Sequence, residues 1–493
     1  MDIISRFRFI TGLNQYATAL TDGIDSLTYK ELDNYSDHLA ETLRAREVKH
    51  KDRVALCTGR SIESIIAMLA ILKCGAAYVP VDTTNETKSR IENILISAEV
   101  KVVLISVDEE KNYSPICDTL RIDIARMKST PAIITEFCSS PDDRAYITFT
   151  SGSEGEPKGV IIPHRSVLRL VVGEDFVNIN QRDVFLFHSS ISFDASTFEI
   201  WGALLNGCCL VVYSESYFDP NKILKLINEQ DVSVLWLTST IFNVFAEHYI
   251  NAFKKLRVIL SGGDVVKPES VRKVIKSWPH IAVINGYGPT ENTTFTCTHT
   301  MTIRNLPDDI CPIGIPIKGT QIHILDSELN PTTQGELYIS GLGLAIGYLC
   351  EKTTHKNFIL CDKVSKEVIY KSGDIVKINS CGLIEFVGRH DSQVKIRGYR
   401  VSLNEIRNKL LEFELVIDAR VDVIKDKLGD CFISADVYLR HHNYQCEQKI
   451  KEKIVTDFPQ YMHPEIYNFL IDVQTNKNGK LIKYRSNNEY RRA

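Results

Sequence analysis

The sequence lacks any long uninterrupted run of apolar residues. The longest run near the N-terminus, Ile65 to Leu72, stops at Lys73, far short of the roughly 18 residues that a membrane-spanning helix needs. The first twenty residues also lack the charged start, apolar core and small-residue cleavage site of a secretory signal. We therefore expect a soluble, cytoplasmic protein that does not associate with a membrane.

A strong excess of one charge sign is also missing. Lys and Arg together number 58 against 62 Asp and Glu, which gives a net charge of −4. Such a balance provides no basic field of the kind that attracts nucleic acid. Nucleic-acid binding is therefore not expected.

The cysteines lack the paired spacing of metal sites. There are 13 of them in 493 residues, none in a C-x-x-C pattern, and the adjacent pair Cys208-Cys209 is too tight for ordinary zinc geometry. A chain of this length with scattered cysteines is not a disulfide framework. The thiols indicate a reducing compartment, and we expect no zinc site.

What is present is an alternation of apolar β-rich runs with helical periodicity. Runs at 54–58, 100–105, 232–237, 256–260 and 281–287 read as strands, and a helix is expected near 61–72. This order predicts an α/β fold with parallel sheets packed by helices, whose ligand-binding loops follow the carboxyl ends of the strands. At roughly 150 residues per domain, the length corresponds to about three domain-sized units.

Beyond about residue 310 the pattern changes to short extended runs separated by Gly, Asn and Asp. These runs, at 320–326, 335–341, 367–378 and 382–388, predict an antiparallel or mixed β subdomain. After Asp391 strands alternate with helices again, which indicates a small α+β C-terminal domain.

The segment 146–160, YITFTSGSEGEPKGV, carries the first chemical signal. Glycines and hydroxyls surround Lys158 just after a strand-like run, and such a loop can wrap a polyphosphate with its backbone N–H groups. It is not a Walker loop, because Pro157 precedes the lysine and Gly159 follows it. Glycine content alone would also allow a flexible surface loop.

This segment resembles the T-S-G-[ST]-x-G-x-P-K-G signature of the adenylate-forming enzymes, which include acyl-CoA synthetases, luciferases and the adenylation domains of nonribosomal peptide synthetases. Further family-like segments follow the same order along the chain: LKCGAAYVPVD (72–82), FDASTFEIWGALLNG (193–207), NGYGPTENTT (285–294), GELYISGLGLAIGYL (335–349), YKSGDIVKI (370–378), GRHDSQVKIRGYRV (388–401) and NKNGK (476–480). Together they resemble an amino-acid adenylation domain of the peptide-synthetase type.

The resemblance implies an enzyme with two half-reactions. A carboxylate would attack the α-phosphorus of ATP to give an acyl-adenylate and pyrophosphate, and a phosphopantetheine thiol would then displace AMP. The residues implied to bind ATP are Thr150, Ser151, Gly152, Ser153, Gly155, Lys158, Gly263, Asn285, Tyr287, Asp374 and Arg389.

Individual roles follow from the same resemblance. Tyr287 would stack on adenine, with Asn285 at the edge of the base, and Asp374 would accept the ribose hydroxyls. The residues implied to be catalytic are Thr290 and Arg389 at the α-phosphate, Glu291 as the Mg²⁺ ligand, and Lys480 on the reacting carboxylate and phosphate.

The resemblance also implies a moving C-terminal domain. Residues 1–388 would form the adenylation core, 389–393 a hinge at Asp391, and 394–493 a small mobile domain. After adenylation this domain would turn and present Lys395 and Gly398 to the path of the incoming thiol.

The substrate is implied to be an α-amino acid, because Asp194 resembles the anchor of the substrate ammonium group. An alternative role for Asp194 is capping the following helix. The implied amino-acid site comprises Asp194, Ala195, Phe198, Trp236, Leu260, Gly262, Gly286, Thr294, Phe295 and Lys480. This combination resembles the pattern of valine-activating domains, with two glycines leaving width and large apolar residues closing the far end. Isoleucine and 2-aminobutyrate are slower alternatives, because one methylene contributes only about 1–3 kcal/mol to discrimination.

One departure and two alternatives accompany this interpretation. Glu154 and Glu156 place carboxylates in the phosphate loop, where they would repel triphosphate unless they help to hold Mg²⁺ or point outward. A carboxylic-acid:CoA ligase and a catalytically impaired nucleotide-binding homologue are the competing functions. The expected partner is a phosphopantetheinylated carrier protein acting in trans, because the chain ends soon after Lys480. The need for a small MbtH-like protein is left open.

Overall fold

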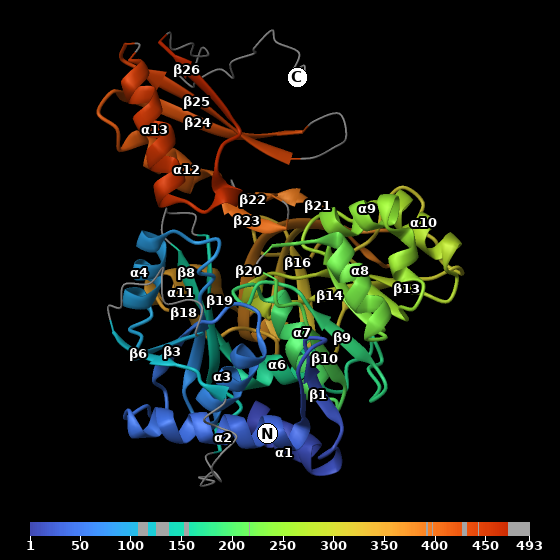
Figure 1. Cartoon of the computed structure of the whole chain (residues 1–493). Coiled ribbons are helices and arrows are strands. Elements are labelled where there is room, and N and C mark those ends of the chain that lie inside the picture. The colour runs from blue at the N-terminus through green and yellow to red at the C-terminus, as the bar shows by residue number, and fades with distance from the viewer. Residues whose placement is uncertain are drawn as a thin grey trace. The chain divides into compact units, whose positions relative to one another are not determined.

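A computed structural model describes residues 1–106, 117–124, 138–151, 157–215, 217–390, 393–396, 398–425, 431–441 and 443–471. The chain divides into two compact units. Unit 1 comprises Met1–Thr150 and Lys158–Asp391, and unit 2 comprises Ser151–Pro157 and Ser392–Ala493 (Figure 1). The predicted hinge at 389–393 stays a prediction, and Asp391 itself lies outside the described residues.

Unit 1 contains two large sheets. The first has seven strands in the order β18 (Gly347–Tyr348), β8 (Lys158–Pro163), β7 (Arg144–Thr150), β4 (Ala77–Pro80), β3 (Arg53–Cys57), β5 (Val102–Ile105) and β6 (Asp118–Arg121). The second has nine, in the order β15 (Ile315–Pro316), β14 (Cys297–Met301), β13 (Ala282–Tyr287), β12 (Val258–Gly262), β11 (Val234–Thr238), β9 (Val184–Phe187), β10 (Cys209–Val212), β1 (Thr18–Thr21) and β2 (Ser26–Thr28).

Helices pack on these sheets. They are α1 (Ile3–Leu13), α2 (Tyr29–Ala45), α3 (Ile62–Lys73), α4 (Lys88–Ser97), α6 (His164–Val171), α7 (Ala195–Leu204), α8 (Pro220–Glu229), α9 (Ser239–His248), α10 (Pro268–Ser277) and α11 (Glu351–Asn357), with the 3-10 helices η2 (Ile250–Phe253) and η3 (Thr290–Asn292). The helix expected near 61–72 is confirmed as α3.

The period-two alternation of strand residues gives each sheet two buried faces. On β3, Val54 and Leu56 join the hydrophobic cluster that contains α3, whereas Ala55 and Cys57 join the one that contains α4. In the nine-stranded sheet, Leu235 belongs to the cluster with α8, α9 and α10, while the next residue, Trp236, belongs to the cluster with α6 and α7. Figure 1 shows α8, α9 and α10 grouped on one side of unit 1.

Both large sheets are mixed rather than purely parallel as the alternation predicts. Strands β9 to β13 are parallel, but β14 and β15 are antiparallel to their neighbours. The phosphate-loop segment connects β7 to β8, which also pair antiparallel. The physical reason is length, because the connection spans only residues 151–157 and a parallel crossover needs a dozen or more residues.

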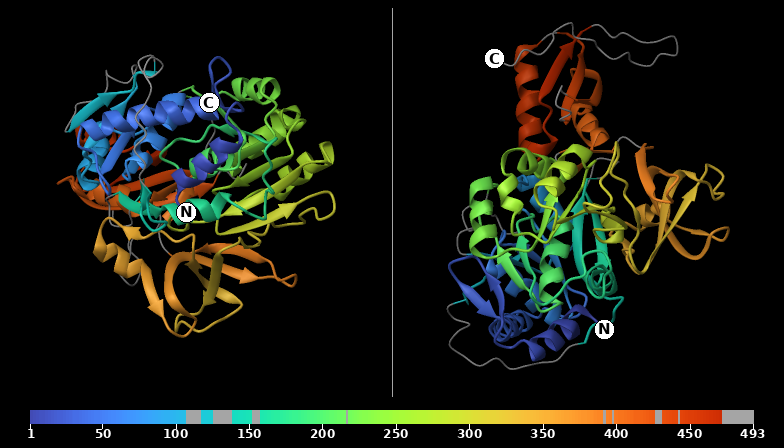
Figure 2. Two further views of the ribbon diagram at one scale, coloured as in Figure 1. Left: turned by 90° about the horizontal axis from the view of Figure 1, so that it is seen from below. Right: turned by 90° about the vertical axis from the view of Figure 1, so that its right-hand side faces the viewer.

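The predicted β subdomain is confirmed as a five-stranded antiparallel sheet. Its order is β16 (Thr320–Leu325), β17 (Gln334–Gly341), β20 (Ser365–Ile378) and β19 (Phe358–Cys361), and β21 (Ile384–Arg389) also pairs with β20. Figure 2 shows these strands in yellow to orange.

Unit 2 has the predicted α+β character. Its elements are β22 (Gln393–Ile396), β23 (Tyr399–Ser402), α12 (Leu403–Leu411), β24 (Val416–Lys425), β25 (Cys431–Leu439), α13 (Tyr444–Asp457), η4 (Gln460–Met462) and β26 (Ile466–Leu470). Both helices and the sheet β24-β25-β26 contribute to one hydrophobic cluster.

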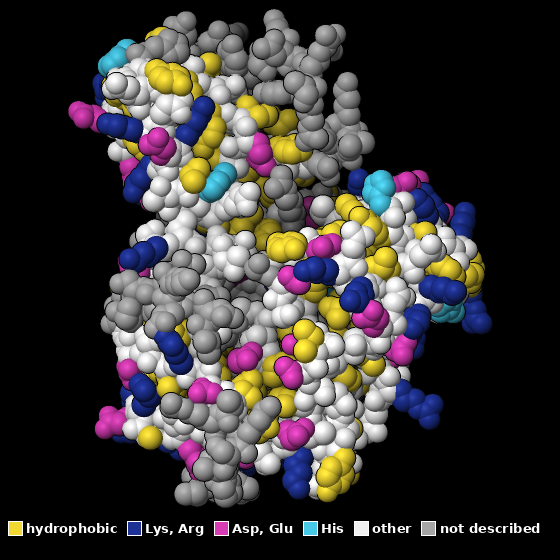
Figure 3. All heavy atoms as spheres, viewed as in Figure 1, with side chains coloured by type: hydrophobic (Ala, Val, Ile, Leu, Met, Phe, Trp, Pro, Cys, Tyr) yellow, Lys and Arg dark blue, Asp and Glu magenta, His cyan; other side chains and the backbone are white. Residues whose placement is uncertain are grey.

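Two further features bear on function. On the face drawn in Figure 3, Lys and Arg side chains are interspersed with Asp and Glu over the described surface. Within the described ranges, no helix combines the length and apolar character needed to cross a membrane.

Candidate active site

The parallel register of β11, β12 and β13 assembles most of the candidate site. Trp236 pairs with Leu260, and two residues further along Thr238 pairs with Gly262, which pairs with Gly286. Because alternate residues share a face, Trp236, Leu260, Gly262 and Gly286 lie on one face at the carboxyl ends of these strands. Asn285 lies on the other face of β13. The sheet thus brings together residues that are up to 50 positions apart.

Gly262 and Gly286 lack a Cβ atom, so neighbouring groups pack directly against the backbone on this face. A Cβ atom on Gly262 would lie 2.0 Å from the carbonyl oxygen of Gly286 and 3.1 Å from the Trp236 ring. A Cβ on Gly286 would lie 2.5 Å from the Phe295 ring. The sequence predicts that these glycines leave width in the pocket, whereas at Gly286 the Phe295 ring lies directly against the backbone.

An aromatic cluster, defined as Phe198, Trp236 and Phe295, covers the glycine-lined face. The Phe295 ring centroid lies 5.3 Å from that of Trp236 and 5.5 Å from that of Phe198. All three side chains are buried, as are the predicted pocket residues Ala195 and Leu260. The aromatic side chains predicted to close the amino-acid site therefore come together.

Asp194 occupies the N-cap position of α7, but its side chain makes no capping hydrogen bond. Its Oδ2 atom instead accepts a hydrogen bond from the Thr290 hydroxyl at 2.7 Å, and its carbonyl oxygen accepts one from the Thr294 hydroxyl at 2.7 Å. The capping alternative is therefore wrong for the Asp194 carboxylate. The carboxylate is aimed at η3, which carries Thr290, the predicted α-phosphate contact, and Glu291, the predicted Mg²⁺ ligand.

Thr293 and Thr294 hold strained backbone conformations beside this contact. Their φ angles are +53° and +66°, in the left-handed region that residues other than glycine rarely adopt. The Thr293 hydroxyl donates to the carbonyl oxygen of Gly343 at 2.9 Å. Together with the Thr294 bond to Asp194, this contact offsets the strain and orients the segment that leads to Phe295.

Arg169 on α6 supports the same segment and was not identified by any motif. Its guanidinium donates to the carbonyl oxygens of Asn292 and Phe295, both at 2.6 Å. Burial lowers its pKa to about 9, so the guanidinium remains a charged donor at neutral pH. Gly343 leaves room for it, because a Cβ there would lie 1.6 Å from the guanidinium.

On the nucleotide side, Tyr287, Asp374 and Arg389 form one hydrogen-bonded group. The Tyr287 hydroxyl donates to Asp374 Oδ2, and Arg389 pairs with Asp374 Oδ1 and donates to the Ser372 carbonyl oxygen at 3.2 Å. Burial, followed by the Asp374 charge, raises the pKa of Tyr287 well above 10. The phenol therefore stays protonated and acts as the donor. These three predicted nucleotide residues are brought together by β13, β20 and β21.

Asn285 is buried with both amide hydrogens engaged. Its Nδ2 atom donates to the carbonyl oxygens of Cys311 at 3.2 Å and Pro312 at 2.8 Å. A contact from this side chain to the adenine edge would therefore use its Oδ1 acceptor. The end of the neighbouring strand β12 continues into Gly263, which has a φ of +78°.

Glu291, the predicted Mg²⁺ ligand, is buried in η3. Its Oε1 atom accepts a hydrogen bond from the Tyr348 hydroxyl at 2.6 Å. The described residues contain no group of three or more His, Cys, Asp or Glu side chains arranged for a metal ion. Mg²⁺ at nucleotide sites is held by one or two carboxylates together with phosphate oxygens and water. A single oriented carboxylate fits that donor set.

A buried polar pair lies behind the aromatic cluster. The His188 Nε2 atom donates to the carbonyl oxygen of Trp236 at 2.6 Å and lies 3.5 Å from Glu199 Oε1 on α7. Ser189 donates to Glu199 through its backbone N–H at 3.1 Å and its hydroxyl at 3.0 Å. Burial raises the pKa of Glu199 to about 8 and lowers that of His188 to about 4. At neutral pH both side chains are therefore uncharged.

The structure describes only some of the remaining predicted residues. Thr150 ends β7 and pairs in register with Lys158, which begins β8. In unit 2, Lys395 lies on β22, Gly398 takes a φ of +88° in the turn to β23, and the Ser151 hydroxyl donates to the Arg400 carbonyl oxygen. Outside the described residues lie Gly152, Ser153, Glu154, Gly155, Glu156, Asp391 and Lys480.

Comparison with known proteins shows the family of the chain. A family model described as "AMP-binding enzyme" matches residues 13–349. One subunit of the linear gramicidin synthase of Brevibacillus parabrevis is 37% identical over 476 residues, 94% of this chain and 6% of the relative. Surfactin synthase subunit 3 of Bacillus subtilis (strain 168) is 34% identical over 487 residues, 97% of this chain and 38% of the relative. The chain thus spans well under half the length of these curated relatives.

Solved structures give the same fold. Holo-PA1221, a nonribosomal peptide synthetase protein containing adenylation and PCP domains, matches with a TM-score of 0.88 and 28% identity, over 98% of this chain and 83% of that one. The N-terminal subdomain of Klebsiella oxytoca NpsA, in complex with 3-hydroxybenzoyl-AMSN, matches with a TM-score of 0.73 and 28% identity, over 78% of this chain and 98% of that one. The fold therefore corresponds to that of peptide-synthetase adenylation domains.

Proposed function

Because the chain belongs to the AMP-binding enzyme family, we propose that it activates an amino acid as its aminoacyl-adenylate. A carboxylate oxygen of the amino acid attacks the α-phosphorus of ATP, and the bond from that phosphorus to the bridging oxygen breaks. Pyrophosphate leaves with the bonding electron pair, and the mixed anhydride with AMP remains.

The observation that carries this proposal is the hydrogen bond between Asp194 and Thr290. It joins the residue expected to bind the substrate ammonium to the residue expected to contact the α-phosphate. The Asp194 carboxylate already accepts a hydrogen bond from the Thr290 hydroxyl, and a further partner that is both a cation and a hydrogen-bond donor would bind it more strongly than a neutral one. An α-ammonium group provides both, and it would place the substrate carboxylate beside η3.

L-valine is the proposed substrate. The aromatic cluster, Ala195 and Leu260 offer buried apolar contacts, which suit a short branched side chain that brings no charge. Discrimination against isoleucine and 2-aminobutyrate is expected to be modest, since one methylene corresponds to about 1–3 kcal/mol.

On the nucleotide side, we propose that ATP binds side chains that pair with one another in the structure. Asp374 accepts from Tyr287 and pairs with Arg389, and the two ribose hydroxyls would donate to the same carboxylate. Arg389 is then available to the ribose or the α-phosphate, with Thr290 and Lys480 as further donors. Preorganised donors of this kind stabilise charge that develops on phosphate oxygens.

Glu291 is proposed to hold Mg²⁺ together with phosphate oxygens. The bound ion supplies charge neutralisation of the polyphosphate. Tyr348 fixes the orientation of the Glu291 carboxylate through its hydroxyl group, so the carboxylate would need little rearrangement when nucleotide binds.

The second half-reaction is proposed to transfer the aminoacyl group to a phosphopantetheine thiol on a carrier protein. Holo-PA1221 contains both adenylation and PCP domains, which supports a carrier as the partner class. Lys395 and Gly398 would line the thiol path after movement of the C-terminal domain about Asp391. A requirement for an MbtH-like protein would appear as higher activity when one is added.

ATP–pyrophosphate exchange tests the proposal directly. The full chain is assayed with labelled pyrophosphate and a panel of amino, hydroxy and fatty acids. Exchange with valine but not with hydroxy or fatty acids is the expected result. Exchange with fatty acids alone would favour the acid:CoA ligase, and ATP binding without exchange for any acid would favour an impaired homologue.

A further inference from the structure

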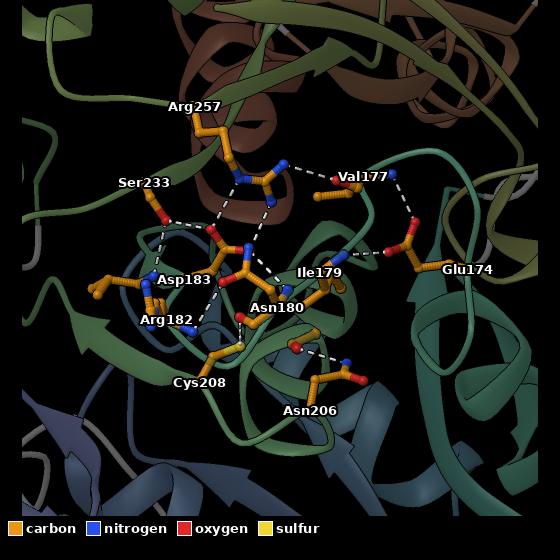
Figure 4. Close-up of polar contacts among 12 residues, drawn as sticks. Glu174, Val177, Ile179, Asn180, Arg182, Asp183, Asn206, Cys208, Ser233 and Arg257 are labelled. Carbon is orange, nitrogen blue, oxygen red and sulfur yellow. Dashed lines mark hydrogen bonds and ion pairs between the residues drawn. The ribbon is translucent and has the colours of Figure 1, made fainter.

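The segment between α6 and β9 is shaped by one carboxylate. Glu174 accepts hydrogen bonds from the backbone N–H groups of Phe176 at 2.9 Å, Val177 at 2.7 Å and Ile179 at 2.8 Å. Figure 4 shows the contacts with Val177 and Ile179. Hydrogen bonds to a charged group are stronger than neutral ones. Three of them on one side chain fix the path of residues 174–179 without a helix or strand.

The other end of the segment is anchored to the nine-stranded sheet. Asp183 accepts from Arg257 at 3.1 and 2.7 Å and from Ser233 at 2.8 Å. Arg257 also donates to the carbonyl oxygen of Val177 at 3.0 Å, as Figure 4 shows. Ser233 and Arg257 each lie one residue before a parallel strand, β11 and β12 respectively. The segment is therefore tied to the strands that carry Trp236 and Leu260.

This segment carries Phe176 into the aromatic cluster. The Phe176 ring centroid lies 6.1 Å from that of Phe198 and 5.9 Å from that of Phe295, with the second contact edge-on at 85°. The side chain is nearly buried, with 8% of its surface exposed. Phe198 and Phe295 are two of the residues expected to close the amino-acid site, and the Phe176 ring packs against both of them.

We propose that Phe176, held in place by Glu174, is a positioning residue that limits the size of the side chain accepted by the amino-acid site. The inference rests on the proposed function and extends it to a residue outside every motif. Packed aromatic side chains hold one another in place through contacts that smaller residues do not make. Removal of the Phe176 ring opens space into which Phe198 and Phe295 can relax, so the site enlarges.

The test compares pyrophosphate exchange for valine and leucine in wild-type protein and Phe176→Leu. The expected result is a roughly tenfold fall in the valine-to-leucine ratio of kcat/KM, the size of effect that a change of one or two methylenes produces in an apolar pocket. The KM for ATP should stay within about twofold, because the Phe176 ring contacts the aromatic cluster rather than the Tyr287–Asp374–Arg389 group.

Phe253→Leu is the matched control. Phe253 is equally a buried phenylalanine, but it packs against Phe242 and Phe245 in the cluster on the opposite face of the sheet. Loss of its ring should lower the thermal midpoint without changing the valine-to-leucine ratio. Phe176→Met also removes the ring, and its side chain has nearly the volume of leucine, so it should lower the ratio in the same direction and covers the case in which Phe176→Leu fails to fold. Glu174→Gln should shift the ratio in the same direction as Phe176→Leu.

Two outcomes would overturn the inference. If valine exchange is intact in wild-type protein and the ratio is unchanged in Phe176→Leu and Phe176→Met, the role proposed for Phe176 is refuted. The proposed function is not affected by that result. An equal change in ratio for Phe253→Leu shows that selectivity follows stability rather than this segment. Wild-type protein that exchanges no amino acid at all refutes the proposed function, which is a separate result.

Discussion

On the amino-acid side of the candidate site, buried rings pack at centroid distances of 5.3–5.5 Å. On the nucleotide side, by contrast, ionisable groups bind one another through Asp374. The first arrangement selects by shape, since apolar packing tolerates little change in volume. The second selects by charge and hydrogen bonding, and its groups can change partners when a ligand arrives. Asp194 stands between them, bonded to Thr290 of η3.

The largest expected effect comes from removing the charge of Asp194. In Asp194→Asn the KM for the amino acid should rise roughly ten- to a hundredfold, because a hydrogen bond to a charged group contributes about 1.5–3 kcal/mol. The KM for ATP should change about twofold or less. Steady-state pyrophosphate exchange measures both constants. The exposed Asp362→Asn is the control, and an unchanged amino-acid KM would exclude Asp194 as the ammonium anchor.

The matching change on the nucleotide side is Asp374→Asn. It removes the carboxylate that the ribose would use and that now pairs with Arg389. We expect the KM for ATP to rise on the order of tenfold, at the lower end of the range for charged hydrogen bonds, with a much smaller effect on the amino-acid KM. Kinetics at saturating amino acid measure the effect. Equal rises in both constants would show that the two sides do not act separately.

The smallest expected effect concerns Glu199 and is a pH dependence of stability. Its folded pKa of about 8 exceeds the ordinary value of 4.5, so its stabilising contribution is complete below pH 4.5 and is lost as the pH rises to 8. His188 acts oppositely. Its folded pKa of about 4 lies below 6.5, so its contribution is complete above pH 6.5 and is lost toward pH 4. Of this pair, Glu199 supplies the larger slope between pH 6.5 and 8.

Glu199→Gln should therefore remove a decline in the free energy of unfolding of about 1 to 2 kcal/mol between pH 6.5 and 8. Urea unfolding at the two pH values measures it. The exposed Glu328→Gln should keep the wild-type decline. If Glu199→Gln showed the same decline in the free energy of unfolding as wild-type protein, Glu199 would not be protonated in the folded protein at neutral pH.

Much of the fold was predictable from local patterns. The apolar run before Lys73 predicts α3, and the run at 256–260 predicts β12, because helical spacing and short β-rich runs act over a few residues. The mixed character of the sheets was not predictable from that alternation. In the seven-stranded sheet it depends on the seven-residue connection between β7 and β8, which is too short for a parallel crossover.

Some residues of the candidate site were likewise predictable from the sequence and others were not. Motif resemblance identified Asp194, Tyr287 and Asp374, and the structure brings the last two together. It did not identify Arg169 or Phe176, which have no local signature. Arg169 matters because its guanidinium reaches the carbonyl oxygens of Asn292 and Phe295, a contact that exists only after α6 packs beside η3.

The sequence by itself determined which residue types are available and in what order along the chain, and so the family resemblance. Tertiary structure decided how they are used. It turned the Asp194 carboxylate away from the helix that it could cap and toward Thr290. It also placed the Phe295 ring against Gly286. Both outcomes depend on the register of parallel strands and on packing between segments far apart in sequence, and neither is encoded in any short stretch of residues.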